Sequence, residues 1–163
     1  RKQIAFRVGI SNGLWAKADR AATLQILDNL ISNALKYSPP NTTVHVHALP
    51  EAGSVLVKIR DEGPGINAED QKKLFQRFTR LSARPTGGES STGLGLSIVK
   101  RLAEAMSGSI QCYSQEGSGA TFTLRLPAWP KETAQTEIFG VKSEDAARFV
   151  RLGDISPRIE SRN

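Results

Sequence analysis

The chain has 163 residues, of which 39% are hydrophobic, and its formal net charge is +6 at pH 7. This length suits one compact domain with a genuine core and at most a small appendage. The positive charge is spread along the amino end instead of forming one dense tract, so we expect no nucleic-acid partner. The residues concerned are Arg1, Lys2, Arg7, Lys17 and Arg20.

A single cysteine, Cys112, excludes an internal disulfide and a cysteine-rich metal site, which suits a reducing compartment. The sequence contains no apolar run as long as a membrane span, and no signal-peptide pattern begins it. We therefore expect this piece to be cytoplasmic and monomeric by itself. A dimeric, membrane-anchored parent protein stays open.

The first third of the sequence predicts two strands, a long helix and a hairpin. Apolar residues alternate over residues 3–8, as in a half-buried strand, and a second short strand covers residues 14–18. Asp19 is a suitable N-cap for a helix over residues 20–37, which the run Ser38-Pro39-Pro40-Asn41 ends. Two further alternating runs, 43–49 and 54–60, predict a β-hairpin.

The middle of the sequence predicts two helices on either side of a loop. Asn67 can cap a helix over residues 68–78, and residues 79–92 form a loop rich in Ser, Gly, Thr, Arg and Pro. Helical periodicity returns over residues 94–106. Two runs with alternating apolar residues follow, 109–114 and 120–126, and each predicts a strand.

This order of elements predicts an α+β two-layer sandwich, with a mainly antiparallel sheet and three main helices on one face. We expect residues 1–129 to form the domain and residues 130–163 to form a tail or linker. Within that tail, residues 143–152 have the composition of one short helix.

Polar side chains share one side of the first predicted helix. At about 100° per residue, Asn29, Asn33, Lys36 and Tyr37 fall in one sector, and apolar residues occupy the opposite side. An amide oxygen can ligate Mg²⁺, an ammonium can bind phosphate, and a ring can stack on a base. Considered alone, the same residues fit backbone capping, solvation and core packing equally well.

The segment Asp61-Glu62-Gly63-Pro64-Gly65 follows a predicted strand directly. Its glycines would let the backbone approach a flat ligand. The carboxylate of Asp61 accepts hydrogen bonds and donates none, so it suits the exocyclic amino group of adenine and would reject guanine. In isolation, this segment is more simply a Pro-Gly turn.

Two glycine-containing segments complete the candidate site. Ser91-Thr92-Gly93-Leu94-Gly95-Leu96 opens a predicted helix, where free amides can bind phosphate. It matches neither a Walker loop nor a dinucleotide fingerprint. The segment 117–121 is most simply a hairpin turn, from which the Thr121 hydroxyl could reach a base through water.

Five segments, in order, carry a specific resemblance between about residues 3 and 127. They are Asn29 to Ser38, Asp61-x-Gly63-x-Gly65, Phe75-Gln76-Arg77-Phe78, Gly93-Leu94-Gly95-Leu96-Ser97-Ile98-Val99 and Gly117-Ser118-Gly119-Ala120-Thr121-Phe122. They resemble the N, G1, F, G2 and G3 boxes of the sensor histidine kinase ATP-binding domain, a Bergerat-fold relative of gyrase, the large heat-shock chaperones and MutL. One departure is Ser91, where the family often has glycine.

The resemblance implies an ATP site. Asn33 would hold Mg²⁺, while Asn29 and Lys36 approach the phosphates, and these three would be the catalytic residues. Tyr37 and Ile66 would flank the adenine that Asp61 recognises. Phe75 to Arg80 would anchor a lid, with Arg77 or Arg80 near the γ-phosphate. The other residues expected at ATP are Gly63, Gly65, Phe78, Thr92, Gly93, Leu94, Gly95, Leu96 and Thr121.

The implied function is protein-histidine kinase activity within a two-component system. MgATP would donate its γ-phosphoryl group to a histidine on a separate helical dimerisation domain of the parent protein, and a response regulator would act downstream. The only histidines, His45 and His47, alternate with Val44 and Val46 and are expected to be ordinary strand residues.

Other classes of the same fold remain as alternatives. A clamp or chaperone ATPase would place a glutamate base one turn before the Mg²⁺-binding asparagine, where this chain has Asn29. An anti-sigma-type serine kinase generally lacks the Phe75-x-x-Phe78 segment. A degenerate nucleotide-sensing module would have lost ligands that this chain retains.

Overall fold

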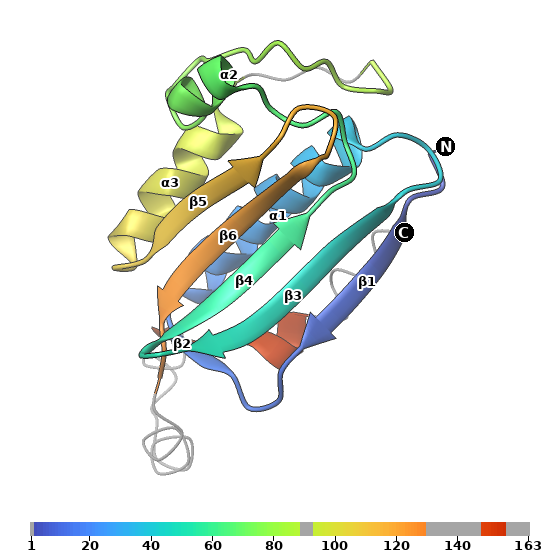
Figure 1. Ribbon diagram of the computed structural model, residues 1–163. Coiled ribbons are helices and arrows are strands. Elements are labelled where there is room, and N and C mark those ends of the chain that lie inside the picture. Colours follow the sequence, from blue (N-terminus) through green and yellow to red (C-terminus); the bar gives the residue numbers. More distant parts are fainter. Residues whose placement is uncertain (1, 89–92, 130–147, 156–163) are drawn as a thin grey trace.

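The structure is a computed structural model, and it describes residues 2–88, 93–129 and 148–155. A five-stranded sheet has the order β1-β3-β4-β6-β5, in which β1 runs parallel to β3 and the other neighbours are antiparallel (Figure 1). The bounds are β1 Ala5–Ile10, β3 Thr43–Glu51, β4 Ser54–Arg60, β5 Ser109–Ser114 and β6 Ala120–Pro127.

Two helices, α1 (Arg20–Tyr37) and α3 (Gly95–Ala105), cover one face of this sheet, and a short helix, α2 (Ala68–Lys73), lies beyond one end of it (Figure 1). The predicted α+β sandwich is thus confirmed, although only two of the three helices lie on the sheet. Among the described residues, no helix is both long enough and apolar enough to cross a bilayer.

The long helix α1 begins and ends where its sequence signals predict. The Asp19 carboxylate accepts a hydrogen bond from the Ala22 amide at 2.7 Å, as an N-cap does. At the other end Ser38 leaves the helical conformation, with φ −69° and ψ 135°, because the residue before a proline disfavours it. The buried side of the helix consists of Thr23, Ile26, Leu27, Leu30, Ile31 and Ala34.

The predicted helix over residues 68–78 is too long. The α-helix ends at Lys73, and the chain continues in turns to Phe78, whose φ of +57° is incompatible with a right-handed helix. Leu74 is buried, but Phe78 is 74% exposed, so the expected apolar stripe stops after one turn. The sequence periodicity predicted too long a helix because it counted Phe78 among the buried positions, whereas this side chain does not pack against the core.

The carboxyl-terminal segment also differs from its prediction. Residues Phe149–Arg151 form strand β7, which pairs antiparallel with β2 (Trp15–Lys17), and a 3-10 turn over Leu152–Ile155 follows. The helix expected over residues 143–152 is therefore wrong for 149–152, and residues 143–147 lie outside the described residues. The pairing with β2, which is distant in sequence, overrides the local composition.

This segment, which lies within the predicted tail or linker, contributes side chains to the core of the sandwich. Val150 and Leu152 are fully buried, and Ile155 is nearly so. The ring of Phe149 lies 4.2 Å from that of Trp129, measured between centroids.

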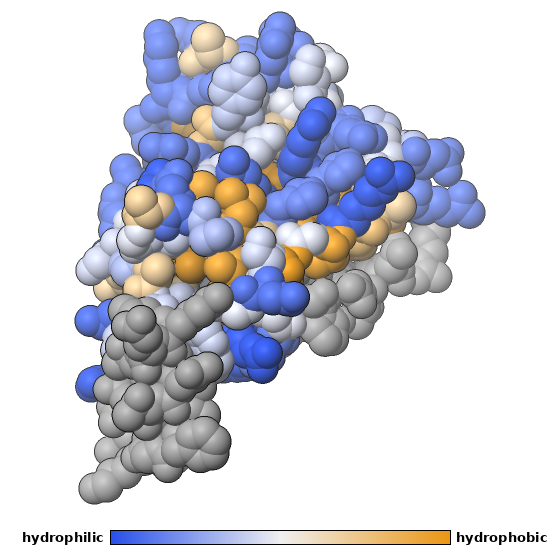
Figure 2. Space-filling view, turned by 60° about the horizontal axis from the view of Figure 1, so that its bottom comes forward, coloured by the Kyte–Doolittle hydropathy of each residue, from blue (hydrophilic) through white to orange (hydrophobic). Residues whose placement is uncertain are grey.

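Figure 2 shows that the surface on this side of the molecule is mainly hydrophilic, with a narrow strip of hydrophobic residues.

Replacing Leu152 by alanine should therefore lower the free energy of unfolding by about 2 to 5 kcal/mol, because it leaves a cavity in the core. Urea unfolding followed by circular dichroism measures the change. The matched control is Asp154→Ala, an exposed position on the same turn, which should change stability by less than about 0.5 kcal/mol. Equal midpoints for Leu152→Ala and the wild type would show that the segment is not part of the core.

Candidate functional site

Two adjoining cavities lie between α1, the start of α3 and the described loop residues 79–88, which we call the 79–88 loop. The larger has a volume of about 550 Å³ and the smaller about 40 Å³. The residues that line both are Asn33, Tyr37, Leu81, Ala83 and Leu96. Because they share these walls, the cavities form one site with an open outer compartment and a narrow inner one.

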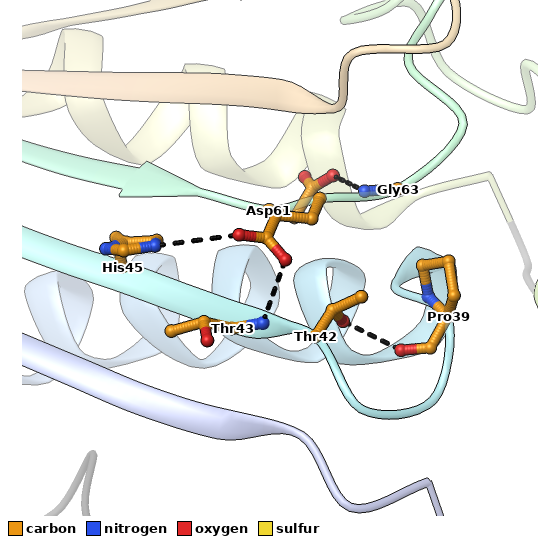
Figure 3. Close-up of polar contacts among 7 residues, drawn as sticks. Pro39, Thr42, Thr43, His45, Asp61 and Gly63 are labelled. Carbon is orange, nitrogen blue, oxygen red and sulfur yellow. Dashed lines mark hydrogen bonds and ion pairs between the residues drawn. The ribbon is translucent and has the colours of Figure 1, made fainter.

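Asp61 lies at the inner compartment. It follows β4 and is only 6% exposed. Its Oδ1 accepts hydrogen bonds from the amides of Gly63 at 2.9 Å (Figure 3) and Ala120 at 3.2 Å, whereas Oδ2 accepts none from the described residues. Burial raises the pKa of Asp61 above its ordinary value, and the two amides oppose that rise. One oxygen of this cavity-lining carboxylate is therefore without a donor among the described residues.

The neighbouring Glu62 links this loop to β3. Its carboxylate accepts a hydrogen bond from the Thr43 amide at 3.2 Å and lies 3.9 Å from Nε2 of His45 (Figure 3). The rings of His45 and His47 stack on the outer face of the sheet, 6.3 Å apart between centroids, while Val44 and Val46, which alternate with them, are buried. The prediction that both histidines are ordinary strand residues agrees with this position.

The glycines after Asp61 serve packing within the protein. Gly65 has φ +73°, and a Cβ there would lie 2.1 Å from the carbonyl oxygen of Gln115. Its backbone thus touches the turn between β5 and β6, where the Gly117 amide also donates to the Pro64 carbonyl at 2.7 Å. Gly65 thus makes a contact between two loops, and it also lines the inner compartment, where its predicted approach to a flat ligand stays a prediction.

Helix α1 supplies one wall of the site. Asn33 and Tyr37 lie one turn apart and line both compartments. Asn29, one turn earlier, does not line them; its Oδ1 lies 2.8 Å from where a Cβ of Gly95 would be. Lys36 also lies outside the lining. Its carbonyl oxygen accepts hydrogen bonds from Lys2 and Thr86.

The start of α3 supplies the opposite wall. Leu94 occupies the N-cap position and makes no side-chain capping bond, so the first amides of α3 have no side-chain acceptor there. Gly93, Gly95 and Leu96 line the outer compartment, and Leu94 does not. Thr92 lies outside the described residues. This arrangement of uncapped amides can bind an anion.

Sequence reasoning missed several residues of the 79–88 loop. Arg80 lines the outer compartment as predicted, but Arg84 does so as well, and Leu81 and Ala83 line both compartments. Only the loop's composition was visible in the sequence, so no signal distinguished these positions. Arg77 and Phe78 are exposed and do not line the cavities.

Thr121 lies on the opposite face from the site. Ala120 and Phe122 line the inner compartment, whereas Thr121 borders a separate depression of about 300 Å³ with Arg60 and Tyr113. Side chains alternate along a strand, so an inward Phe122 requires an outward Thr121. That signal was present in the sequence. Ile66, predicted beside the base, does line the inner compartment, and Gly63 does not.

Comparison with known proteins identifies the family. The model of the histidine kinase-, DNA gyrase B- and HSP90-like ATPases matches residues 18–130. The chain belongs to this family. The predicted resemblance is thus confirmed.

Individual relatives agree. The chain is 37% identical over 138 residues to the sensor-like histidine kinase SenX3 of Mycolicibacterium smegmatis, covering 83% of this chain and 35% of that protein. It is 40% identical over 116 residues to the sensor histidine kinase WalK of Bacillus subtilis, covering 70% of this chain and 19% of WalK. It therefore spans about a third or less of these relatives.

Solved structures show the same architecture. The mycobacterial sensor histidine kinase MprB superposes with a TM-score of 0.71 at 27% identity, over 80% of this chain and 87% of that one. The catalytic domain of the histidine kinase ThkA gives a TM-score of 0.68 at 28% identity, over 79% and 83% of the two chains.

Gly65→Ala should cost considerably more stability than Gly117→Ala. Both positions have a positive φ, which costs an alanine about 1 to 2 kcal/mol, but only the Cβ at residue 65 meets another atom. We expect about that cost for Gly117→Ala and at least about twice it for Gly65→Ala. Chemical denaturation of both variants tests this, and equal destabilisation would refute the proposed loop contact.

Asp61→Asn should not destabilise the protein at pH 7. Since the pKa of Asp61 is raised, the folded state holds the proton more tightly than the unfolded state, and ionisation costs stability. The free energy of unfolding of the variant should equal or exceed that of the wild type at pH 7. The difference in the free energy of unfolding between the variant and the wild type should shrink as the pH falls through the folded-state pKa of Asp61. A less stable variant at pH 7 in urea titrations would contradict this.

Proposed function

We propose that the joined cavities bind MgATP and that the chain transfers the γ-phosphoryl group to a histidine on another domain of its parent protein. The observation that carries this proposal is the buried carboxylate of Asp61, which lines the inner compartment and whose Oδ2 accepts no hydrogen bond from the described residues, together with Asn33 on the shared wall. Membership of the ATPase family supports ATP as the nucleotide.

The inner compartment suits an adenine base. Asp61 Oδ2 can accept a hydrogen bond from the exocyclic amino group, and the carbonyl of guanine at that place would be repelled. Tyr37 and Ile66 offer apolar surface to a flat ring. The inner compartment has a volume of about 40 Å³ and joins the outer one along the walls that both share.

The outer compartment suits a triphosphate. Arg80 and Arg84 supply positive charge, and the uncapped amides at the start of α3 supply donors. Among the described residues, no group of three His, Cys, Asp or Glu side chains could hold a metal ion. Magnesium held by the amide oxygen of Asn33, with phosphates and water completing its coordination, fits this donor set.

The lining of the outer compartment favours transfer over hydrolysis. None of its described residues is a carboxylate or a histidine, so no general base is available there to activate water. A neutral imidazole is already a nucleophile and needs only positioning and charge neutralisation. His45 and His47 lie on the outer face of the sheet, so the acceptor would come from elsewhere in the parent protein, with a response regulator receiving the phosphoryl group afterwards.

Titration with a fluorescent ATP analogue and Mg²⁺ tests the site. The wild type should bind in the micromolar range, and Asp61→Asn should weaken binding at least about tenfold through loss of the charged acceptor. Asn33→Ala should weaken binding in Mg²⁺ but not in EDTA. His47→Ala, on the outer face, is the control and should bind like the wild type. Folded wild-type protein without measurable affinity would refute the proposal.

The transfer step has its own test. Mixing the domain and labelled ATP with a helical histidine domain from the parent protein should give an acid-labile phosphohistidine, while ATP hydrolysis by the domain alone stays slow. Rapid ATP hydrolysis by the domain alone would favour a clamp-type ATPase instead.

A further inference from the structure

We propose that Asp70, on α2, is a positioning residue that holds the 79–88 loop against the nucleotide site through the backbone of Ser82. This inference rests on the proposed function, since it assigns the loop a role in retaining nucleotide. It concerns a residue that lines neither compartment.

The contacts of Asp70 are unusually complete for a carboxylate on a short helix. Its Oδ2 accepts a hydrogen bond from the Ser82 amide at 2.7 Å and one from Asn67 Nδ2 at 3.2 Å, while Oδ1 lies 3.4 Å from Lys73 Nζ. The residue is only 2% exposed. The bond from Ser82 outweighs burial and keeps the pKa of Asp70 below its ordinary value, so the acceptor is charged at neutral pH.

Helix capping does not explain this burial. Asn67 already caps α2, because its Oδ1 accepts a hydrogen bond from the Asp70 amide at 2.8 Å. Glu69, beside it in the same first turn, is exposed. Asp70 is the buried residue of α2, so what this helix buries is a charged acceptor for the loop and not an apolar stripe.

The bond to Ser82 fixes the residues that close the site. Ser82 lies between Leu81 and Ala83, which line both compartments. The loop is held a second time at Thr86, whose amide donates to the Lys36 carbonyl at 2.9 Å and whose hydroxyl donates to the Ser38 carbonyl at 2.8 Å. The cavity-lining residues Ala83 to Pro85 lie between these two anchors.

Without the hydrogen bond to Asp70, the 79–88 loop would have to become ordered at the moment when nucleotide binds. A loop that is already held in place lines the site without an entropic cost of ordering on binding. A released loop would let the nucleotide dissociate sooner. We therefore expect the effect mainly in the dissociation rate of nucleotide.

The first experiment measures amide exchange at Ser82 by NMR in nucleotide-free protein. Asp70→Ala should speed exchange at least about tenfold, since the amide loses its acceptor and alanine still favours the helix. Asp70→Asn keeps an acceptor oxygen without the charge and should fall between Asp70→Ala and the wild type. Glu69→Ala, the matched control, should exchange like the wild type. Unchanged exchange in Asp70→Ala would overturn the proposed anchor.

The second experiment follows dissociation of a fluorescent ATP analogue by stopped flow. Asp70→Ala should dissociate about 3 to 10 times faster, with Asp70→Asn intermediate and Glu69→Ala unchanged. Faster exchange without faster dissociation would overturn the positioning role and leave the proposed function intact. Absence of nucleotide binding by the wild type would instead refute the proposed function, and the exchange experiment would still decide whether the anchor exists.

Discussion

The structure depends on one costly arrangement, the burial of the Asp61 carboxylate after β4. A buried charge requires partners, and here the amides of Gly63 and Ala120 supply them from two different segments. Both segments must therefore meet at this point, which explains the close contact between Gly65 and Gln115. Among the described residues, only one oxygen of this carboxylate accepts hydrogen bonds, and the proposed nucleotide would supply a donor to the other.

Elements with local signals could be predicted from the sequence, and elements fixed by distant contacts could not. Helix α1 is capped by Asp19 and stopped before Pro39, so residues next to the helix determine both of its ends. Strand β7 has only three residues and exists because it pairs with β2. No local pattern reveals such a pairing, and the same holds for the early end of α2, where periodicity alone suggested more helix.

The candidate site divides in the same way. Asn33, Tyr37 and Asp61 were predictable because each belongs to a regular element or directly follows one, and spacing determines the face that it occupies. Arg84 and Leu81 were not, since a loop's position depends on its anchors, and the anchor at Ser82 is a carboxylate twelve residues away in sequence. Thr121 differs from both groups: alternation along β6 would have assigned the site to Ala120 and Phe122.

Asp61 and Asp70 are both buried, and their environments distinguish their roles. Asp70 uses both oxygens within the protein, and the hydrogen bond from the Ser82 amide lowers its pKa. Among the described residues, only one oxygen of Asp61 accepts hydrogen bonds, and burial raises its pKa. An incompletely satisfied buried charge costs stability, and a ligand that donates to it recovers that cost. The environment of Asp61 therefore suits recognition of a ligand that donates a hydrogen bond, whereas the environment of Asp70 suits a residue that holds the 79–88 loop in place.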